Sequence, residues 1–310
     1  MEIKKINSKD VPYDLLFLAD EDDSQIQKYR DDALFWAARE GDEIRGMIGL
    51  KEISPQESEI VCVAVYETFQ NQQIGTRLVE EAVAWSKQKN YKKVIIKTGN
   101  CGIGQLYIYQ RCGFRFESIN RDYFTKFYPL PIYENSLRCA DQIVLSYTIY
   151  SETEKTAAIE DYWKRFVHKK PEYKDRTYET WSFCYGEYLP DKLLGLVRTG
   201  KKTGTSSALE LYEEGEEIPR EGDLSIVTYG NGMPGCIIET KEIRIKKYRD
   251  ISNEEARLEG EGDLSLEYWR KAHEWFFKLE YGNEGKEFSE DIPVIFERFE
   301  LIYDEDYKNL

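Results

Sequence analysis

One stretch, residues 61–78, limits what this chain can fold into more than any other. It begins with a β-branched apolar run of strand length, from Val61 to Val65. It continues into a helical pattern whose apolar residues share one face: Ile74, Leu78, Ala82 and Val83. A strand that feeds a helix through polar residues and a glycine points unpaired backbone N–H groups at the loop, where the helix dipole favours an anion. The stretch therefore predicts a phosphate-sized turn, with an ordinary strand–loop–helix connection as the alternative.

Length and composition indicate two domains. The chain has 310 residues, a length that exceeds the usual size of one domain. Of these residues, 41% are hydrophobic and 14% aromatic, enough to bury sizeable cores. No apolar run approaches the roughly 20 residues that a membrane span needs. The N-terminus, Met1 to Lys5, lacks the apolar segment of a signal peptide. We therefore expect a soluble, cytoplasmic protein without a membrane partner.

Cysteine usage and charge narrow the function classes. The six cysteines form no Cys-x-x-Cys pair and the chain has two histidines, so we expect neither a metal site nor a disulfide framework. Residues 1–150 carry a net charge of −3 and the remainder −12, out of −15 in total. The negative electrostatic potential of this net charge repels nucleic-acid phosphates and attracts cationic amines. It disfavours a broad nucleic-acid footprint but allows a local basic pocket.

The N-terminal half alternates strands and helices. We expect a strand at 1–6, an amphipathic helix at 11–29 interrupted by acidic residues 20–23, strands at 33–38 and 44–53 joined by a hairpin turn, and a strand at 59–65. The loop and its helix follow, ending near residue 89. We then expect a strand at 93–97, a turn at 98–102, a short helix closed by Gly113, and a strand at 114–118.

Two motifs in this order resemble those of the GNAT N-acetyltransferases. The segment from Gln70 to Gly75 is similar to the acetyl-CoA loop of that family, Gln/Arg-x-x-Gly-x-Gly/Ala, with Gln73 in place of the first glycine. The segment 106–114 resembles the family signature in which a tyrosine, here Tyr109, precedes Gly-Phe by three residues. The resemblance covers residues 1–150 and implies a mixed α/β sheet flanked by helices, with acetyl-CoA as co-substrate.

The implied chemistry is acyl transfer from a thioester to an amine. A backbone N–H of the interrupted strand would bind the oxyanion, and Asn100 would hold the pantetheine arm. Tyr109 would give a proton to the departing thiolate, and Glu59 would take the proton of the amine. The alternatives are a core aromatic for Tyr109, a turn residue for Asn100 and a solvated edge charge for Glu59. The expected acetyl-CoA contacts are Val63, Val65, Gln70, Asn71, Gln72, Gln73, Ile74, Gly75, Thr76 and Asn100.

The C-terminal half follows a polar segment, residues 150–155, which we expect to be a linker. A helix should come next, followed by a glycine-punctuated basic turn at 199–206, which lacks the spacing of a nucleotide-binding P-loop. We expect strands at 224–228, 236–240 and 243–245, helices at 253–258 and 265–279, and a strand at 294–303. This order indicates an antiparallel, barrel-like arrangement of strands.

Four segments of this half together resemble an ASCH domain, a small β-barrel with helices that is related to PUA RNA-binding modules. They are residues 200–205, 221–223, 234–240 and 259–270, and the resemblance covers residues 154–305. It implies recognition of RNA or of a modified nucleoside. Some members resemble amidohydrolases of acetylated cytidine that use a lysine, a threonine and a glutamate. By position these would be Lys202, Thr205 and Glu261, although Glu259 also fits the glutamate register.

The sequence thus predicts a two-domain α+β protein, in which an acetyl-CoA-dependent N-acetyltransferase of a small or lysine-like amine carries an ASCH domain. Two alternatives stay open: a non-catalytic GNAT-like acyl-CoA sensor with a ligand-binding ASCH module, and an ASCH amidohydrolase of an acetylated nucleoside. Tyr109 and Gly75 favour the acetyltransferase, whereas Gln73 favours the sensor. We prefer ligand recognition to hydrolysis at the ASCH pocket, because the surrounding acidity should keep Lys202 charged.

Overall fold

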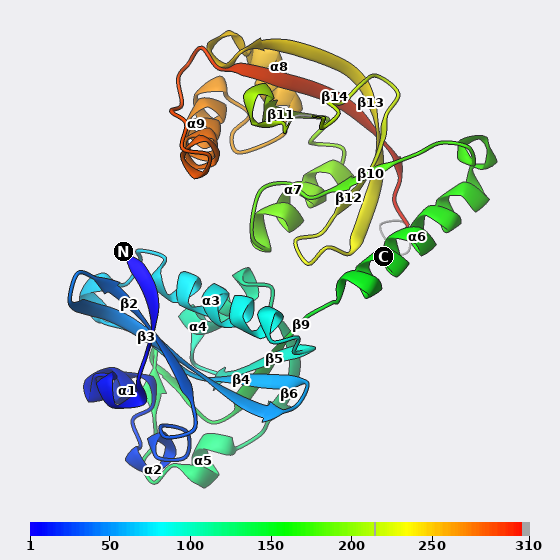
Figure 1. Ribbon diagram of the computed structural model, residues 1–310. Coiled ribbons are helices and arrows are strands. Elements are labelled where there is room, and N and C mark those ends of the chain that lie inside the picture. The colour runs from blue at the N-terminus through cyan, green and yellow to red at the C-terminus, as the bar shows by residue number, and fades with distance from the viewer. Residues whose placement is uncertain (214, 306–310) are drawn as a thin grey trace. The chain divides into compact units, whose positions relative to one another are not determined.

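The computed structural model describes residues 1–213 and 215–305, which divide into two units. The first unit runs from Met1 to Ser151, and the second begins at Glu152. Among the described helices, none combines the length and the apolar character needed to cross a membrane. Figure 1 shows a mixed sheet flanked by helices in the first unit and a strongly curled sheet with helices in the second.

The first unit is built on a seven-stranded sheet with the order β1-β2-β3-β4-β5-β9-β6. All neighbouring pairs are antiparallel except β4 and β5, which are parallel and are joined through α3. A parallel pair needs such a crossover connection, so the loop before α3 lies where the strand β4 ends. The elements are β1 (Glu2–Ile6), α1 (Tyr13–Ala19), α2 (Asp23–Ile26), β2 (Leu34–Glu40), β3 (Glu43–Ser54), β4 (Glu57–Val65), α3 (Ile74–Gln88), β5 (Lys93–Gly99), α4 (Ile103–Arg111), β6 (Arg115–Asn120), α5 (Tyr123–Phe127), β7 (Tyr133–Glu134), β8 (Leu137–Arg138) and β9 (Gln142–Thr148).

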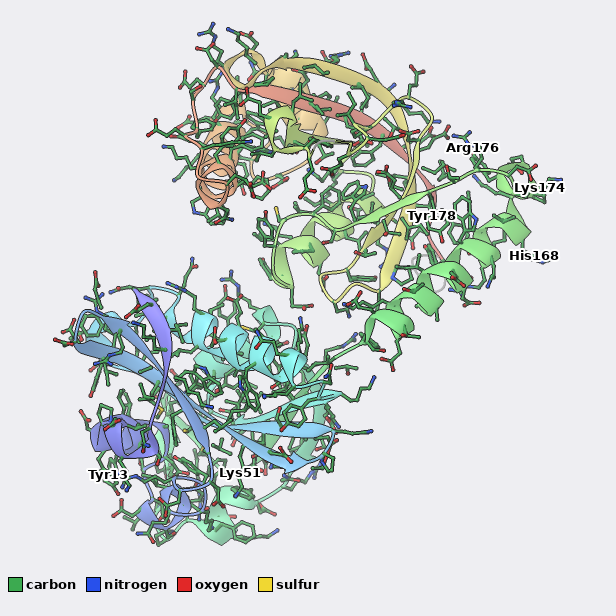
Figure 2. All side chains as sticks on the ribbon, in the orientation of Figure 1. Tyr13, Lys51, His168, Lys174, Arg176 and Tyr178 are labelled. Atoms are coloured by element: carbon green, nitrogen blue, oxygen red, sulfur yellow. The ribbon has the colours of Figure 1, made fainter. Side chains whose placement is uncertain are left out.

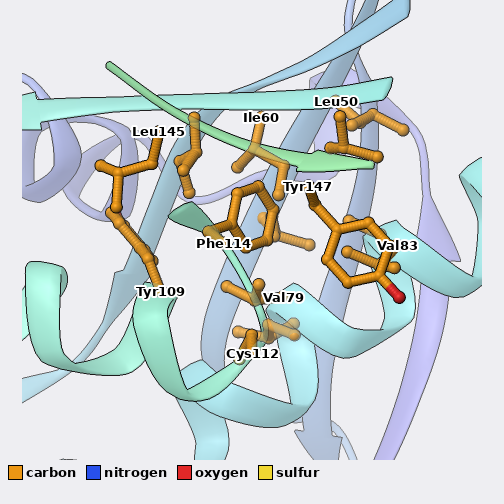
Figure 3. Packing of buried hydrophobic residues seen from close by; sticks show 14 of the residues in the cluster. Leu50, Ile60, Val79, Val83, Tyr109, Cys112, Phe114, Leu145 and Tyr147 are labelled. Carbon is orange, nitrogen blue, oxygen red and sulfur yellow. The ribbon is translucent and has the colours of Figure 1, made fainter. Parts of the chain in front are cut away.

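Two apolar cores cover the faces of this sheet. One lies under α3 and α4 and contains Ile60, Leu78 and Tyr109, and the other lies under α1 and α2 and contains Leu15 and Cys62. Figure 3 shows the first core, in which the ring of Phe114 lies between Tyr109 and Tyr147. These cores hold β4 and β5 in place. The site described below depends on both strands and on the loop that joins β4 to α3.

The helix expected at 11–29 is instead two short helices. α1 ends at Ala19, and the backbone of Asp20 is extended. The side chain of Asp22 then accepts a hydrogen bond from the Ser24 N–H at 2.8 Å and caps the start of α2. Aspartates favour such caps and turns over helix interiors, because their side chains compete for backbone N–H groups. The acidic run therefore creates a corner at Asp20.

The second unit holds a five-stranded sheet with the order β10-β12-β13-β14-β11. The edge strands β10 and β11 stand at opposite ends of that order, so the described sheet is a half-barrel, which agrees with the barrel-like pattern expected from the sequence. The elements are α6 (Glu152–Lys169), β10 (Glu179–Trp181), α7 (Tyr188–Arg198), β11 (Gly204–Ala208), β12 (Leu224–Thr228), β13 (Pro234–Lys247), α8 (Asn253–Leu258), α9 (Leu266–Asn283) and β14 (Pro293–Tyr303). Short 3₁₀ turns occupy Ser8–Asp10, Glu67–Phe69, Pro171–Tyr173, Leu209–Leu211 and Tyr248–Asp250.

Three expectations for this half were wrong in detail. The expected linker at 150–155 is largely helical, since α6 begins at Glu152. It packs on the sheet through Tyr162 and Phe166, while Trp163 contacts Tyr178, labelled in Figure 2, with ring centroids 4.5 Å apart. The strands expected at 236–240 and 243–245 are one strand, β13, whose register shifts between Thr240 and Glu242. The basic turn at 199–206 ends in the strand β11.

Candidate functional site

The loop before α3 presents a row of unpaired donors. Asn71 and Gln73 both adopt left-handed backbone conformations with φ of 62°, and α3 begins at Ile74 without a side-chain cap. Among the described residues, the backbone N–H groups of 71–76 have no hydrogen-bond acceptor. The first turn of a helix leaves such groups free, and consecutive N–H groups near a helix start bind anions. The loop therefore fits a pyrophosphate group.

The backbone conformation of Gln73 explains why the family pattern has a glycine at this position of the loop. Its φ of 62° and ψ of 10° lie in the left-handed region, which costs residues with a Cβ about 1–2 kcal/mol. The chain accepts this conformation with a glutamine, so the substitution leaves the loop path and the N–H donors in place. Gln70 supports the same path, because its side-chain amide donates to the Val65 carbonyl at 3.2 Å.

Gly75 lies in the first turn of α3, with its backbone outside the left-handed region. A Cβ added there would lie 3.6 Å from Ile108 Cδ1 and 3.9 Å from Val65 Cγ2, which are ordinary contacts. An alanine therefore fits, as the family pattern of glycine or alanine at this position implies. A branched side chain would extend beyond this space, either against these neighbours or towards the donors of the first turn.

The strands β4 and β5 separate beside this loop. Their parallel pairing extends from Glu57–Lys93 to Ile60–Ile96 and goes no further, although β4 continues along β3 to Val65. A register shift opposite Gly49 and Leu50 leaves Val61 as an extra residue, a β-bulge. The bulge moves Val63 and Val65 to the core under α3 and α4, on the face that Ile60 occupies before it. The backbone of residues 61–65 thus has a free edge towards β5, as the expected oxyanion contact requires.

Tyr109 lies on α4 in the core next to this opening. The residue is 4% exposed, and its ring centroid is 6.4 Å from that of Phe114. Its hydroxyl makes no hydrogen bond with the described residues. Burial raises the pKa of Tyr109 above its usual range, and the neighbouring Cys62 thiol of β4 adds to this effect. The phenol therefore stays protonated, the form that can donate to a thiolate.

Two expected site residues have partners within the protein. The Asn100 side chain accepts from the N–H groups of Ala140 and Asp141 at 2.8 and 2.9 Å, and it donates to the Arg138 carbonyl at 3.2 Å. These bonds give it a structural role in the turn after β5, so a contact with pantetheine would have to replace one of them. Glu59 pairs with Lys97 of β5, with Oε2 and Nζ 2.8 Å apart.

The second unit buries a charged cluster around Lys202. Its Nζ lies 2.8 Å from Glu259 Oε2 and 3.0 Å from Glu261 Oε1, so both candidate glutamates contact the lysine. The side chains of Lys202 and Glu259 are each 1% exposed. Burial alone would lower the pKa of Lys202, but the two carboxylates outweigh burial and raise it. The lysine is therefore held as an ammonium.

The sequence did not identify the other members of the Lys202 cluster. Glu259 Oε1 accepts from Ser206 Oγ at 2.6 Å and from Trp269 Nε1 at 2.8 Å, and His273 Nε2 lies 3.5 Å away. Ser206 is buried on β11, whereas Thr205 points to the opposite face because strand side chains alternate. Thr205 is therefore not brought to Lys202. The sequence did not predict this alternation, because the turn predicted at 199–206 includes the first residues of β11.

The surroundings of Lys202 include an open cavity of about 360 Å³ that Lys202 and Thr203 line together with Arg298. The Phe183 ring contacts the ammonium, with its centroid 5.2 Å from Nζ. The ammonium is therefore held by Glu259, Glu261 and the Phe183 ring, none of which lines that cavity.

Comparison with known proteins identifies both units. The model of the acetyltransferase (GNAT) family matches residues 2–114. An uncharacterised N-acetyltransferase, YvbK, from Bacillus subtilis is 38% identical over 138 residues, which are 44% of this chain and 89% of that protein. The chain belongs to the GNAT acetyltransferase family. The ASCH domain model matches residues 179–303, which confirms the fusion expected from the sequence. GNAT acetyltransferases use acetyl-CoA, and the loop at 70–76 of this GNAT unit fits its pyrophosphate.

Solved structures resemble each unit of this GNAT–ASCH protein separately. A GNAT family acetyltransferase from Elizabethkingia anophelis with acetyl-CoA bound is 39% identical, covering 47% of this chain and 97% of that one, with a TM-score of 0.46. An ASCH domain from Lactobacillus crispatus is 33% identical, covering 49% of this chain and 96% of that one, with a TM-score of 0.44.

Proposed function

We propose that the N-terminal unit transfers the acetyl group of acetyl-CoA to a primary amine. The observation that carries the proposal is the separation of β4 from β5 after Ile60 and Ile96, beside a loop of unpaired N–H groups. The pyrophosphate would bind the N–H groups of residues 71–76, and the thioester carbonyl would face the free backbone edge of β4.

In this proposal the neutral amine nitrogen attacks the thioester carbonyl, the C–S bond breaks, and the thiolate leaves. Tyr109 supports departure because its phenol is held protonated and is not engaged elsewhere among the described residues. Glu59 takes the amine proton directly or through water, which requires it to loosen its bond with Lys97. The net charge of −15 favours a cationic amine acceptor.

The proposal is tested by incubating the protein with acetyl-CoA and a set of primary amines and measuring release of the free thiol. Amine-dependent release supports an enzyme. Binding of acetyl-CoA without release from any amine supports the alternative, a non-catalytic acyl-CoA sensor.

For the ASCH unit we propose recognition of RNA or of a modified nucleoside rather than hydrolysis. Two carboxylates keep Lys202 in its charged form, and an ammonium is not a nucleophile or a base. The test compares the parent with Lys202→Ala on short RNA and on acetylated cytidine, using Lys201→Ala, an exposed neighbour, as control. Binding lost in the first variant alone supports recognition, whereas acetate release that disappears with Lys202 supports the amidohydrolase.

A further inference from the structure

The C-terminal half of α6 and the turn that follows it form a basic segment in an otherwise acidic unit. Residues 164–176 carry a net charge of +4, whereas the rest of the chain from residue 151 to residue 310 carries −16. The segment lies outside the residues that match the two family models, 2–114 and 179–303, so neither match accounts for it. Its basic residues are Lys164, Arg165, Lys169, Lys170, Lys174 and Arg176.

The helix dipole explains only part of this charge. Cations in the last turn of a helix are favoured by its dipole, and α6 ends at Lys169. Lys170, Lys174 and Arg176 come after the helix, where no such dipole acts on them. Figure 2 shows His168 on the last turn of α6, and Lys174 and Arg176 on the turn that follows it. The basic segment therefore extends past the helix onto a surface turn.

Three of the cations are weakly engaged within the protein. Lys164 lies 3.6 Å from Glu160 and Lys174 lies 3.9 Å from Asp175, and all four side chains are more than half exposed. Exposed ion pairs of this kind contribute little to stability. Lys170 forms no ion pair with any carboxylate of the described residues. These three lysines are therefore available to an anionic partner.

Aromatic rings lie among the same cations. Lys170 Nζ lies over the Tyr173 ring, 5.9 Å from its centroid. The ring centroids of Trp163 and Tyr178 are 4.5 Å apart, and all three rings are partly exposed. The bases of a single-stranded nucleic acid stack on such rings while its phosphates contact the neighbouring cations. The combination favours a single strand over an acidic polypeptide, which has no bases to stack.

The segment lacks the apolar side chains that a membrane partner requires. A helix that lies on a membrane buries exposed Trp, Phe or Leu side chains in the lipid. Among the described residues, none of the exposed large apolar side chains lies between Glu152 and Tyr178. The apolar face of α6 already packs against the sheet of its own unit. An anionic polymer with stacking bases therefore fits this surface better than a lipid surface.

We propose that residues 164–176 bind the phosphate backbone of single-stranded RNA. Lys164, Lys170 and Lys174 contact phosphates, and the Tyr173 ring stacks on a base. The inference rests on the RNA recognition proposed for the ASCH unit and adds to it a second contact surface, which does not include Lys202. Because phosphate contacts position a nucleic acid without reading its sequence, this surface holds the strand and leaves recognition of a base to the Lys202 cluster.

The test measures binding of a fluorescein-labelled oligouridylate of about 15 nucleotides to the full chain, by fluorescence anisotropy at several KCl concentrations. Lys164 and Lys174 are replaced, because Arg165 and Lys169 already share Glu305. We expect Lys164→Ala/Lys174→Ala to weaken binding about 10-fold at low salt. The slope of log Kd against log[KCl] should fall by about 1.4, since each phosphate contact on a single strand contributes about 0.7.

Two further variants separate a phosphate contact from an effect on folding. Lys271→Ala/Lys278→Ala is the matched control, because both lysines lie on α9 and Lys278 also pairs with the residue one turn before it, Glu274. It should keep the affinity and the slope of the parent. Lys164→Arg/Lys174→Arg retains both charges and should keep them too.

Parent affinity and slope in Lys164→Ala/Lys174→Ala overturn the proposal, and so does equal weakening in the α9 control. Binding of phosphatidylserine vesicles or of polyglutamate as tight as that of RNA also overturns it, because the surface would then accept any polyanion. Failure of the parent to bind RNA overturns it as well. In that case, binding of acetylated cytidine that requires Lys202 leaves the nucleoside recognition proposed for the ASCH unit standing.

Discussion

Ile60 and Ile96 are the last paired residues of the parallel strands β4 and β5. Beyond them, β4 keeps its bonds with β3 to Val65 and β5 keeps its bonds with β9 to Gly99. The two strands therefore separate while each remains supported on its other side. In the proposed acetyltransferase this arrangement would give the thioester a rigid backbone edge, with the proposed pyrophosphate loop following β4 in the chain.

Replacing Gly75 with valine should abolish the stabilisation by acetyl-CoA. A ligand that binds only the folded state raises its stability by about 2.7 kcal/mol at a hundredfold excess over Kd, and the valine side chain should exclude the pyrophosphate. Thermal unfolding with and without acetyl-CoA measures this. Gly104→Val is the matched control, because Gly104 is also helical and a Cβ there meets nothing within 4 Å. Gly75→Ala should retain the shift, and a full shift in Gly75→Val would contradict the loop assignment.

Glu59→Gln should lower kcat by about 100-fold or more if Glu59 is the base, while acetyl-CoA binding remains unchanged. Glu57→Gln provides a close control, since Glu57 lies on the same strand 3.8 Å from Lys93. Steady-state kinetics with saturating amine would show the difference. If Glu59→Gln and Glu57→Gln have equal kcat values, Glu59 is not the base and serves only as the ion-pair partner of Lys97.

The buried pair of Lys202 and Glu259 should make the second unit sensitive to acid. Lys202 holds the pKa of Glu259 well below its usual value of 4.5, against the opposing effect of burial. A lowered folded-state pKa means that the stabilisation is present above about pH 4.5 and is lost as pH falls towards the folded-state pKa. Glu259→Gln should cost about 3 kcal/mol at pH 7, because it leaves a buried ammonium with less compensation.

Chemical denaturation of the parent and of Glu259→Gln from pH 7 to pH 3 checks this dependence. The difference in unfolding free energy should shrink as the pH falls. Glu254→Gln, on an exposed residue at the start of α8, should cost little at any pH. A difference between parent and Glu259→Gln that does not depend on pH would mean that Glu259 acts through packing alone.

Elements with a clear local sequence pattern, such as an apolar run, helical spacing or a helix cap, were predicted correctly. The apolar run at 61–65 and the helical spacing after Ile74 predicted β4, the loop and α3, and the Asn253–Leu258 helix was predicted to its bounds, where a capping box of Ser252 and Glu255 begins it. Strand β11 was missed, since Gly204–Ala208 lacks the β-branched apolar character of a buried strand.

Residues far apart in the sequence are brought together by tertiary contacts that no local sequence pattern encodes. Asp20 and Tyr128 are 108 positions apart, and only the packed fold brings them together. Trp269 reaches Glu259 because the pitch of α9 turns it inward, and Ser206 does so because β11 alternates its side chains. The resemblance to ASCH domains pointed to Lys202 together with Glu259 and Glu261. Finding that Ser206 and not Thr205 faces this cluster required β11 to be recognised as a strand.

The most direct test of the central claim is the rate of amine-dependent thiol release from acetyl-CoA by the parent, by Tyr109→Phe and by Tyr107→Phe. The phenylalanine at 109 keeps the packing against Phe114 and removes only the hydroxyl, while Tyr107 is an exposed neighbour on the same helix, 60% accessible. We expect release by the parent, an unchanged rate in Tyr107→Phe, and a rate lower by about 100-fold in Tyr109→Phe with acetyl-CoA binding retained. Parent rates in Tyr109→Phe, or no release by the parent with any amine, would contradict the account.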